Sequence, residues 1–235
     1  MMTDAELMKE IRKYRCADLS DGMDAIGLVD KGTMNESMRP LRPGIEFKGF
    51  AYTIKLLPKS DAVKECKTVD EWREELGKEC DKIYSFVGEI TPERAKDTVI
   101  VVDMEGVRGG LWGSEIAMTM MERGVEGTVL DGGCRDSYET NLENAPVFCT
   151  KRTFTHAYGR VEPGALNIPV NCAGVTVKPG DIVCADDDGV LVIPRERAEE
   201  VIMFAKMQLE DDIQARTEHY DNLGFEHDDT LKRME

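Results

Sequence analysis

One stretch of the sequence, residues 98–136, constrains the fold of this chain more than any other. An apolar run at Thr98–Asp103 is followed by the glycine-rich segment R-G-G-L-W-G-S-E at 108–115. A helical apolar pattern over Ser114–Arg123 and a second apolar run at Gly127–Asp131 come next. This order predicts a βαβ unit, whose two strands are parallel and joined by a right-handed crossover. The chain therefore contains a parallel strand pair with a glycine-rich loop before the helix.

The same stretch carries the residues best suited to chemistry. The N-terminus of a helix offers unpaired N–H groups and positive potential, which suit a carboxylate or a phosphate. Arg135 can hold a carboxylate or keto oxygen with two donors, and Asp136 can hold a hard divalent cation. A structural ion pair after the strand would give the same Arg-Asp pattern, and a tight turn that needs positive φ would give the same glycines. These two structural interpretations stay open, and beside them the pattern predicts a metal-assisted site for a small oxo-acid.

The segments before this stretch show helical and extended patterns. A helix is expected from Thr3, which is spaced from Glu6 as in a capping box, and a second at about Leu19–Gly27. Residues 49–57 are β-rich. Residues 68–96 are charged and mostly helical, and their candidate buried positions are Trp72, Leu76, Ile83 and Phe86.

The character of the chain changes after Pro146. Short β-like runs separated by Gly and Pro turns occur at Val147–Thr150, Asn167–Asn171, Val175–Val177, Ile182–Ala185 and Val190–Ile193. Helical patterning returns only at about Ala198. A (β/α)8 barrel needs a helix after almost every strand, so this half of the chain argues against it. The expected fold class is α/β, with parallel strands on one side and a β-rich layer on the other.

Charge and cysteine usage limit the classes of function. The chain has 46 acidic and 30 basic residues, a formal charge of -16, which argues against nucleic-acid binding and against docking on an anionic membrane. A small anionic substrate remains compatible, because the local geometry at Arg135 can outweigh a distant, screened field. Seven cysteines without C-x-x-C spacing indicate reduced thiols. With no apolar segment typical of a signal peptide or a membrane span, the expected location is the cytoplasm.

Four further features have a simpler structural interpretation. Asp186-Asp187-Asp188-Gly189 is typical of a hairpin turn and lacks the ligand spacing of a calcium loop. Asp131 could support a metal site or cap the loop that follows it. His156 could line the entrance of a site, but a surface loop is the simpler expectation. The cluster Met118, Met120 and Met121 is expected in the core.

An ordered set of sequence motifs resembles the RraA-like family, which includes 4-hydroxy-4-methyl-2-oxoglutarate aldolases and regulators of ribonuclease activity. The resemblance covers about residues 15–200 and is interrupted near 60–97. The matching motifs are L-W-G at 111–113, R-G-V-E-G-T-V-L-D-G-G-C-R-D at 123–136, P-V-F at 146–148, I-P-V at 168–170, G-V-T-V-K-P-G-D-I-V at 174–183, A-D-D-D-G-V-L-V-I-P at 185–194 and, more loosely, L-S-D-G-M-D-A-I-G at 19–27.

The resemblance implies an α/β/β sandwich of the swivelling-domain type, assembled as trimers or hexamers with sites near subunit interfaces. It also implies a divalent-metal aldolase that acts on pyruvate-derived hydroxy-oxo acids, often with oxaloacetate decarboxylase activity. Arg135 would bind the pyruvyl part of the substrate, and Asp136 would hold Mg²⁺ or Mn²⁺ largely through water. The substrate carboxylate would meet the backbone of Gly109, Gly110, Leu111, Trp112, Gly113 and Ser114.

This chain departs from the aldolase pattern at one position. The aldolases carry an acidic residue 21 positions before the arginine, where this chain has Ser114. Glu115 follows, but one residue along a helix turns a side chain by about 100°, so its catalytic use would require a rearranged loop. The alternative to an enzyme is therefore a regulatory protein without catalysis, whose acidic surface docks on a basic partner such as a ribonuclease.

The expected organisation is one RraA-like domain over residues 1–235. Its core spans about 15–200, a charged helical insertion spans about 60–97, and a helical extension spans about 196–235. The insertion would either cover the site or build a contact between subunits.

Overall fold

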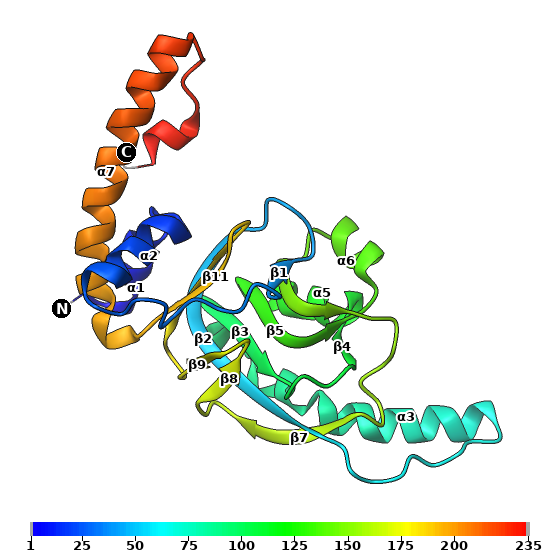
Figure 1. Cartoon of the computed structure of the whole chain (residues 1–235). Coiled ribbons are helices and arrows are strands. Elements are labelled where there is room, and N and C mark those ends of the chain that lie inside the picture. Colours follow the sequence, from blue (N-terminus) through cyan, green and yellow to red (C-terminus); the bar gives the residue numbers. More distant parts are fainter. Residues whose placement is uncertain (1, 234–235) are drawn as a thin grey trace.

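The predicted βαβ unit lies at the centre of the computed structural model, which describes residues 2–233 (Figure 1). Strand β3 (Thr98–Asp103) lies parallel to β5 (Gly127–Cys134), and Val99 is in register with Gly127. Helix α5 (Ser114–Arg123) connects them and ends at Gly124, whose φ of 90° favours glycine. All six residues of β3 are buried, as expected for a central strand of a parallel sheet.

Within the described part of the chain, the central sheet is mixed and has nine strands. The neighbouring strands β2, β3, β5 and β6 are parallel, and β4 joins β5 in the same direction. Antiparallel strands β1, β7, β10 and β11 extend the sheet. The remaining bounds are β1 (Arg39–Pro40), β2 (Phe47–Pro58), β4 (Gly110–Trp112), β6 (Val147–Arg152), β7 (Val161–Leu166), β10 (Ile182–Asp186) and β11 (Gly189–Ile193).

The β-rich side predicted for the second half of the chain is present and confirms the α/β class. The hairpin of β8 (Val170–Cys172) and β9 (Val175–Val177) forms a separate two-stranded sheet. Its valines share a core cluster with Val99 and Val129 of the parallel strands. Strands β10 and β11 are continuous with the parallel strands through β2, which is 12 residues long and pairs with β3 on one side and with β10 on the other.

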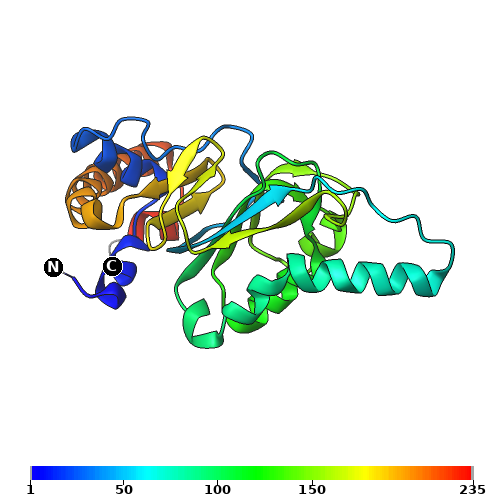
Figure 2. The same cartoon turned by 90° about the horizontal axis from the view of Figure 1, so that it is seen from below.

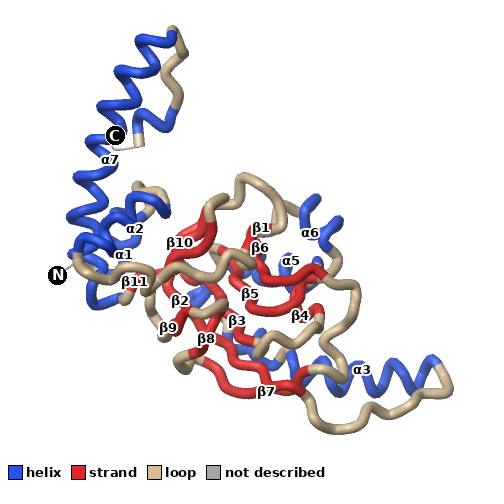
Figure 3. Tube along the Cα trace, in the orientation of Figure 1, coloured by secondary structure: helices blue, strands red, loops and turns tan. Residues whose placement is uncertain are grey.

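Helices cover two separate regions of the sheet (Figures 1 and 2). Helices α3 (Val69–Ile83), α4 (Pro92–Ala95) and α5, with the 3-10 turn η1 (Ser85–Glu89), lie beside the parallel strands, and Phe86 and Ile90 join their core cluster. Helices α1 (Asp4–Ile11), α2 (Cys16–Ala25) and α7 (Ala198–Leu223) pack on β10 and β11. The tube in Figure 3 shows that α7 continues well beyond this contact before η3 (Asp229–Lys232) folds back along it.

Several local predictions are confirmed and several are wrong. The capping box of Thr3 and Glu6 starts α1, and Asp186 pairs with Gly189 across a hairpin turn. Helix α2 begins at Cys16 rather than at Leu19, because Asp18 and Arg15 form its N-terminal cap. Helix α6 (Ser137–Leu142) and strands β1, β4 and β7, each six residues or fewer, were not expected.

The predicted buried positions are right for some side chains and wrong for others. Ile83, Phe86 and Met120 are buried. Trp72 is 41% exposed although its ring packs on that of the buried Tyr158, and Met118 and Met121 lie on the exposed side of α5. All seven cysteines are free thiols. Within residues 2–233, no helix is both long and apolar enough to cross a membrane.

Candidate active site

The glycines of the 109–113 segment allow two chain segments to approach each other closely. A Cβ atom on Gly110 would lie 2.6 Å from the carbonyl oxygen of Thr155, and one on Gly113 would lie 2.5 Å from Oδ2 of Asp136. Neither glycine has positive φ, so the interpretation as a tight turn is wrong. Glycine is required here because a side chain would displace the Arg-Asp pair.

The Arg-Asp pair lies where β5 ends and α6 begins. The N–H of Arg135 donates to the carbonyl oxygen of Trp112 at 2.8 Å, which fixes the pair against β4. Asp136 has a φ of 51°, in the left-handed region, and precedes the first residue of α6. Nε of Arg135 donates to Oδ1 of Asp136 at 3.1 Å. Among the described residues, the two terminal nitrogens of Arg135 have no hydrogen-bond partner and are free for a ligand.

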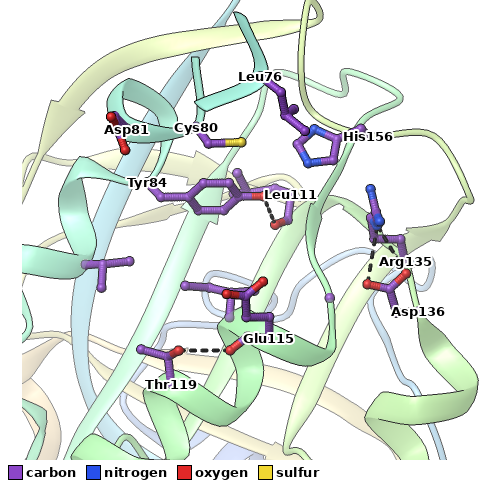
Figure 4. A pocket seen from close by; sticks show the side chains of 13 residues that line it. Leu76, Cys80, Asp81, Tyr84, Leu111, Glu115, Thr119, Arg135, Asp136 and His156 are labelled. Atoms are coloured by element: carbon purple, nitrogen blue, oxygen red, sulfur yellow. Dashed lines mark hydrogen bonds and ion pairs between the residues drawn. The ribbon is translucent and has the colours of Figure 1, made fainter. Parts of the chain in front are cut away.

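A cavity of about 540 Å³ opens beside this pair (Figure 4). Glu115, Arg135, Asp136 and His156 line its polar end. The remaining lining comes from the start of α5 with β4, and from the 60–97 insertion: Leu111, Gly113, Ile116, Thr119, Leu76, Cys80, Asp81, Tyr84 and Val87. This segment, which was expected to be an insertion and is called the insertion below, therefore forms one wall of the cavity.

The side chains of Ser114 and Glu115 point in different directions. Oγ of Ser114 donates to Oε1 of Glu143 at 2.5 Å and does not line the cavity, whereas Glu115 does. Glu115 thus reaches the cavity from the first turn of α5. A carboxylate lines the cavity although Ser114 stands where the family resemblance implies an acidic residue.

Five of the predicted site residues line the cavity and four do not. Leu111, Gly113, Glu115, Arg135 and Asp136 are lining residues. Gly109 and Gly110 lie behind them against Ala157 and Thr155. Trp112 is fully buried and stacks on Phe86, so it supports the site from within the core.

His156 is a functional candidate for which the sequence left two positions open, a surface loop and the entrance of a site, and the structure agrees with the second. It is half-buried, forms a β-bridge with Gly110 and lines the cavity. Its Nδ1 accepts the N–H of Tyr158 at 2.8 Å, so the neutral ring carries its proton on Nε2. Burial, and then the charge of Arg135, lower its pKa. No sequence spacing marks this histidine, because its neighbours in the site are distant in the chain.

The donor set fits a hydrated hard cation better than a closed metal site. Asp136 and Glu115 present carboxylates to one cavity, and Mg²⁺ is typically bound by one or two carboxylates with several waters. Across residues 2–233, no three His, Cys, Asp or Glu side chains gather closely enough to hold a metal by themselves. Asp131 is engaged elsewhere, since it accepts from Thr150 Oγ1 and from the N–H of Ala173. These partners lie in β6 and in the turn between β8 and β9, and not in the loop that follows Asp131, so the prediction that it caps this loop is wrong.

The fold and this cavity define an α/β protein with one cationic group and two carboxylates at a helix N-terminus. Residues 16–192 match the family described as RraA-like: Aldolase/RraA, and the chain belongs to this family.

Individual relatives support the same assignment. The chain is 33% identical over 201 residues to Protein DlpA of Legionella pneumophila, a match that covers 85% of this chain and 29% of that protein. It is 31% identical over 112 residues to a 4-hydroxy-4-methyl-2-oxoglutarate aldolase of Thermus thermophilus, covering 47% of this chain and 67% of the relative. The chain thus spans under a third of the length of DlpA.

A solved structure shows the same fold at lower identity. Streptomyces coelicolor RraAS2, described as an unusual member of the RNase ES inhibitor RraA protein family, superposes with a TM-score of 0.74. The match covers 92% of this chain and 98% of that structure at 23% identity.

Proposed function

We propose that this protein is a carbon–carbon lyase that releases pyruvate from a 4-hydroxy-2-oxo acid by retro-aldol cleavage, with decarboxylation of oxaloacetate as a related reaction. The observation that carries this proposal is the convergence of Arg135, Asp136 and Glu115 on one cavity at the start of α5. Family membership and the aldolase name of a relative support the same class.

The substrate carboxylate has a well-defined place to bind. The first N–H groups of α5 have no partner within the helix, and Gly113 supplies no side-chain cap. Arg135 lies beside them, since a Cβ on Gly113 would be 3.2 Å from its Cγ. Helix N–H groups and an arginine together bind one carboxylate and the keto oxygen next to it.

The chemistry needs stabilisation of an enolate and movement of one proton. When the bond between C3 and C4 breaks, its electron pair passes toward the C2 oxygen, where the terminal nitrogens of Arg135 stabilise the negative charge. Donors placed in this way contribute about 3 kcal/mol to transition-state binding. Glu115 is positioned to accept the proton of the C4 hydroxyl, and Nε2–H of His156 can donate to a substrate oxygen.

A divalent metal belongs to this proposal. Asp136 would hold Mg²⁺ or Mn²⁺ largely through water, and the metal would supply Lewis-acid charge at the keto oxygen. Assembly as a homotrimer or hexamer in the cytoplasm, without nucleic acid or membrane as partner, completes the proposal.

The test follows pyruvate release from oxaloacetate and from 4-hydroxy-4-methyl-2-oxoglutarate, with Mg²⁺ and with EDTA. We expect metal-dependent release that Arg135→Ala lowers at least 100-fold, since about 3 kcal/mol corresponds to this factor. Asp136→Ala and Glu115→Gln should also lose activity while their circular dichroism and thermal unfolding stay close to wild type. Full activity in Arg135→Ala would disprove the proposed site.

A further inference from the structure

We infer that the substrate is a monocarboxylic 4-hydroxy-2-oxo acid whose distal group is apolar, because the insertion builds a largely apolar wall without a cation across the cavity from the Arg-Asp pair. This inference rests on the proposed lyase function and adds the class of substrate. It differs from the dicarboxylic substrate named for the aldolase relative.

The wall consists of side chains from α3, η1 and α5. Leu76, Cys80 and Tyr84 lie on one side of α3 and its C-terminal end, and Val87 and Ile116 continue the surface. Leu76, Cys80 and Tyr84 are all half-buried, and Figure 4 shows Leu76, Cys80 and Tyr84 above Glu115, across the cavity from Asp136. Five adjacent side chains thus offer carbon or sulfur surface to a ligand.

The polar atoms of this wall are already engaged. The hydroxyl of Tyr84 donates to the carbonyl oxygen of Leu111 at 2.8 Å, and that of Thr119 donates to the carbonyl oxygen of Glu115 at 2.9 Å. Burial raises the pKa of the Cys80 thiol, so this side chain is neutral and acts as a small hydrophobe. The wall therefore offers no free side-chain donor to a second carboxylate.

The charges of the cavity also favour a single carboxylate. Within the described chain, Arg135 is the only Lys or Arg among the lining residues. The acidic lining side chains are Asp81, Glu115 and Asp136. A distal carboxylate would lose water without gaining a cation, and Asp81 on the insertion would repel it.

The size of the cavity fits a longer distal group. Its volume of about 540 Å³ lies within the range of about 300–1,000 Å³ found for pockets that enclose whole small molecules. The pyruvyl part occupies only the end beside Arg135 and α5. The remaining space lies along the apolar wall.

The inferred reaction is balanced without another reactant. In R–CH(OH)–CH2–CO–COO⁻ the bond between C3 and C4 breaks, the hydroxyl proton is lost from C4, and C3 gains a proton. The products are the aldehyde R–CHO and pyruvate, with R apolar.

The first experiment measures binding rather than turnover. Two non-cleavable 2-oxo acids of equal shape are compared by calorimetry with Mg²⁺ present: 2-oxoglutarate, and 5-methyl-2-oxohexanoate, in which an isopropyl group replaces the distal carboxylate. Full burial of a methylene strengthens binding about fourfold, so two buried methyl groups should favour 5-methyl-2-oxohexanoate at least 10-fold. Equal or tighter binding of 2-oxoglutarate would overturn the inference.

A matched pair of variants tests whether the insertion causes this preference. Leu76→Arg adds a cation to the wall, whereas Gly77→Arg adds it one residue along, where a Cβ meets nothing within 4 Å. We expect Leu76→Arg to weaken binding of 5-methyl-2-oxohexanoate and to strengthen binding of 2-oxoglutarate at least fivefold. Gly77→Arg should bind both acids as wild type does. If both variants behave alike, the wall does not select the distal group.

Turnover separates failure of this inference from failure of the lyase function. Pyruvate release is measured from 4-hydroxy-5-methyl-2-oxohexanoate and from 4-hydroxy-2-oxoglutarate. Faster release from the first supports both proposals, and faster release from the second overturns the substrate class alone. Release from neither, with the binding preference intact, overturns the lyase function and leaves the selectivity of the cavity standing.

Discussion

At the scale of single residues, the site depends on a glycine that holds no ligand itself. Gly113 has an extended backbone, with a φ of -151° that alanine also adopts, yet its missing side chain leaves room for Asp136. Its role is therefore to allow contact between α5 and the Arg-Asp pair. Gly124, at the other end of α5, has a φ of 90° and open space around it, so its role is conformational.

Gly113→Ala should therefore impair activity more than stability. A methyl group 2.5 Å from Oδ2 of Asp136 must push the carboxylate away, so we expect at least a tenfold loss of pyruvate release. Gly124→Ala should instead lower the free energy of unfolding by about 1–2 kcal/mol and leave activity unchanged. Assays of turnover and of urea unfolding on both variants check this contrast.

His156 predicts a pH dependence of stability. Its pKa is lowered in the folded protein, so below about pH 6.5 the unfolded chain binds a proton that the folded chain does not. The stabilisation of the folded protein by the buried, neutral ring of His156 is present above about pH 6.5. It is lost as the pH falls through the lowered pKa. His156→Gln should therefore lose less stability than wild type between pH 7 and pH 5, measured by urea unfolding. Equal losses in the two proteins would contradict this role.

At the scale of elements, the insertion is fixed to the body of the protein by specific contacts. Glu71 and Thr68 form a capping box that starts α3. The ring of Trp72 meets that of Tyr158 edge-on at 4.8 Å between centroids, and Lys59 pairs with Glu79. Tyr158 follows His156 by two residues, so this contact connects α3 to the segment that carries the histidine.

Trp72→Ala should loosen the cavity wall. An aromatic pair contributes about 0.5–1.5 kcal/mol beyond its buried area, so a modest loss of stability is expected. Binding of 5-methyl-2-oxohexanoate should weaken several-fold as α3 gains freedom, as calorimetry would show. Glu74→Ala, an exposed change on the same helix, is the control and should leave binding unchanged.

At the scale of the whole molecule, the N-terminal helices α1 and α2 and the C-terminal helix α7 pack together on β10 and β11. Leu7 and Leu19 of the N-terminal helices share a core cluster with Val201 of α7. Arg15 pairs with Asp18, whose side chain is fully buried, and with Asp212 of α7. One guanidinium therefore joins the N-terminal helices to the C-terminal helix, far from the cavity.

Arg15→Met should destabilise the protein without changing the site. Loss of one partner leaves the buried Asp18 carboxylate uncompensated, at a cost of about 3–5 kcal/mol. The further change Asp18→Asn should restore part of this loss. Urea unfolding measures both effects, and unchanged stability in Arg15→Met would show that the pair contributes nothing.

The sequence by itself determined the elements whose signals are local. The capping box of Thr3 and Glu6, the bounds of α5 and the hairpin turn at Asp186–Gly189 depend on residues within a few positions of one another. The motifs at 123–136 likewise identified the family and the Arg-Asp pair, because these residues are contiguous.

Only the tertiary structure decided how distant segments meet. It turned Ser114 toward Glu143 and Glu115 into the cavity, exposed Trp72, and brought His156 and the insertion against Arg135. The physical reason is that periodicity and capping act along one element. The cavity is instead formed where segments that are distant in the sequence, from Leu76 to His156, pack together. The Arg-Asp pair could be read from the chain, but the cavity wall across from it exists only in the fold.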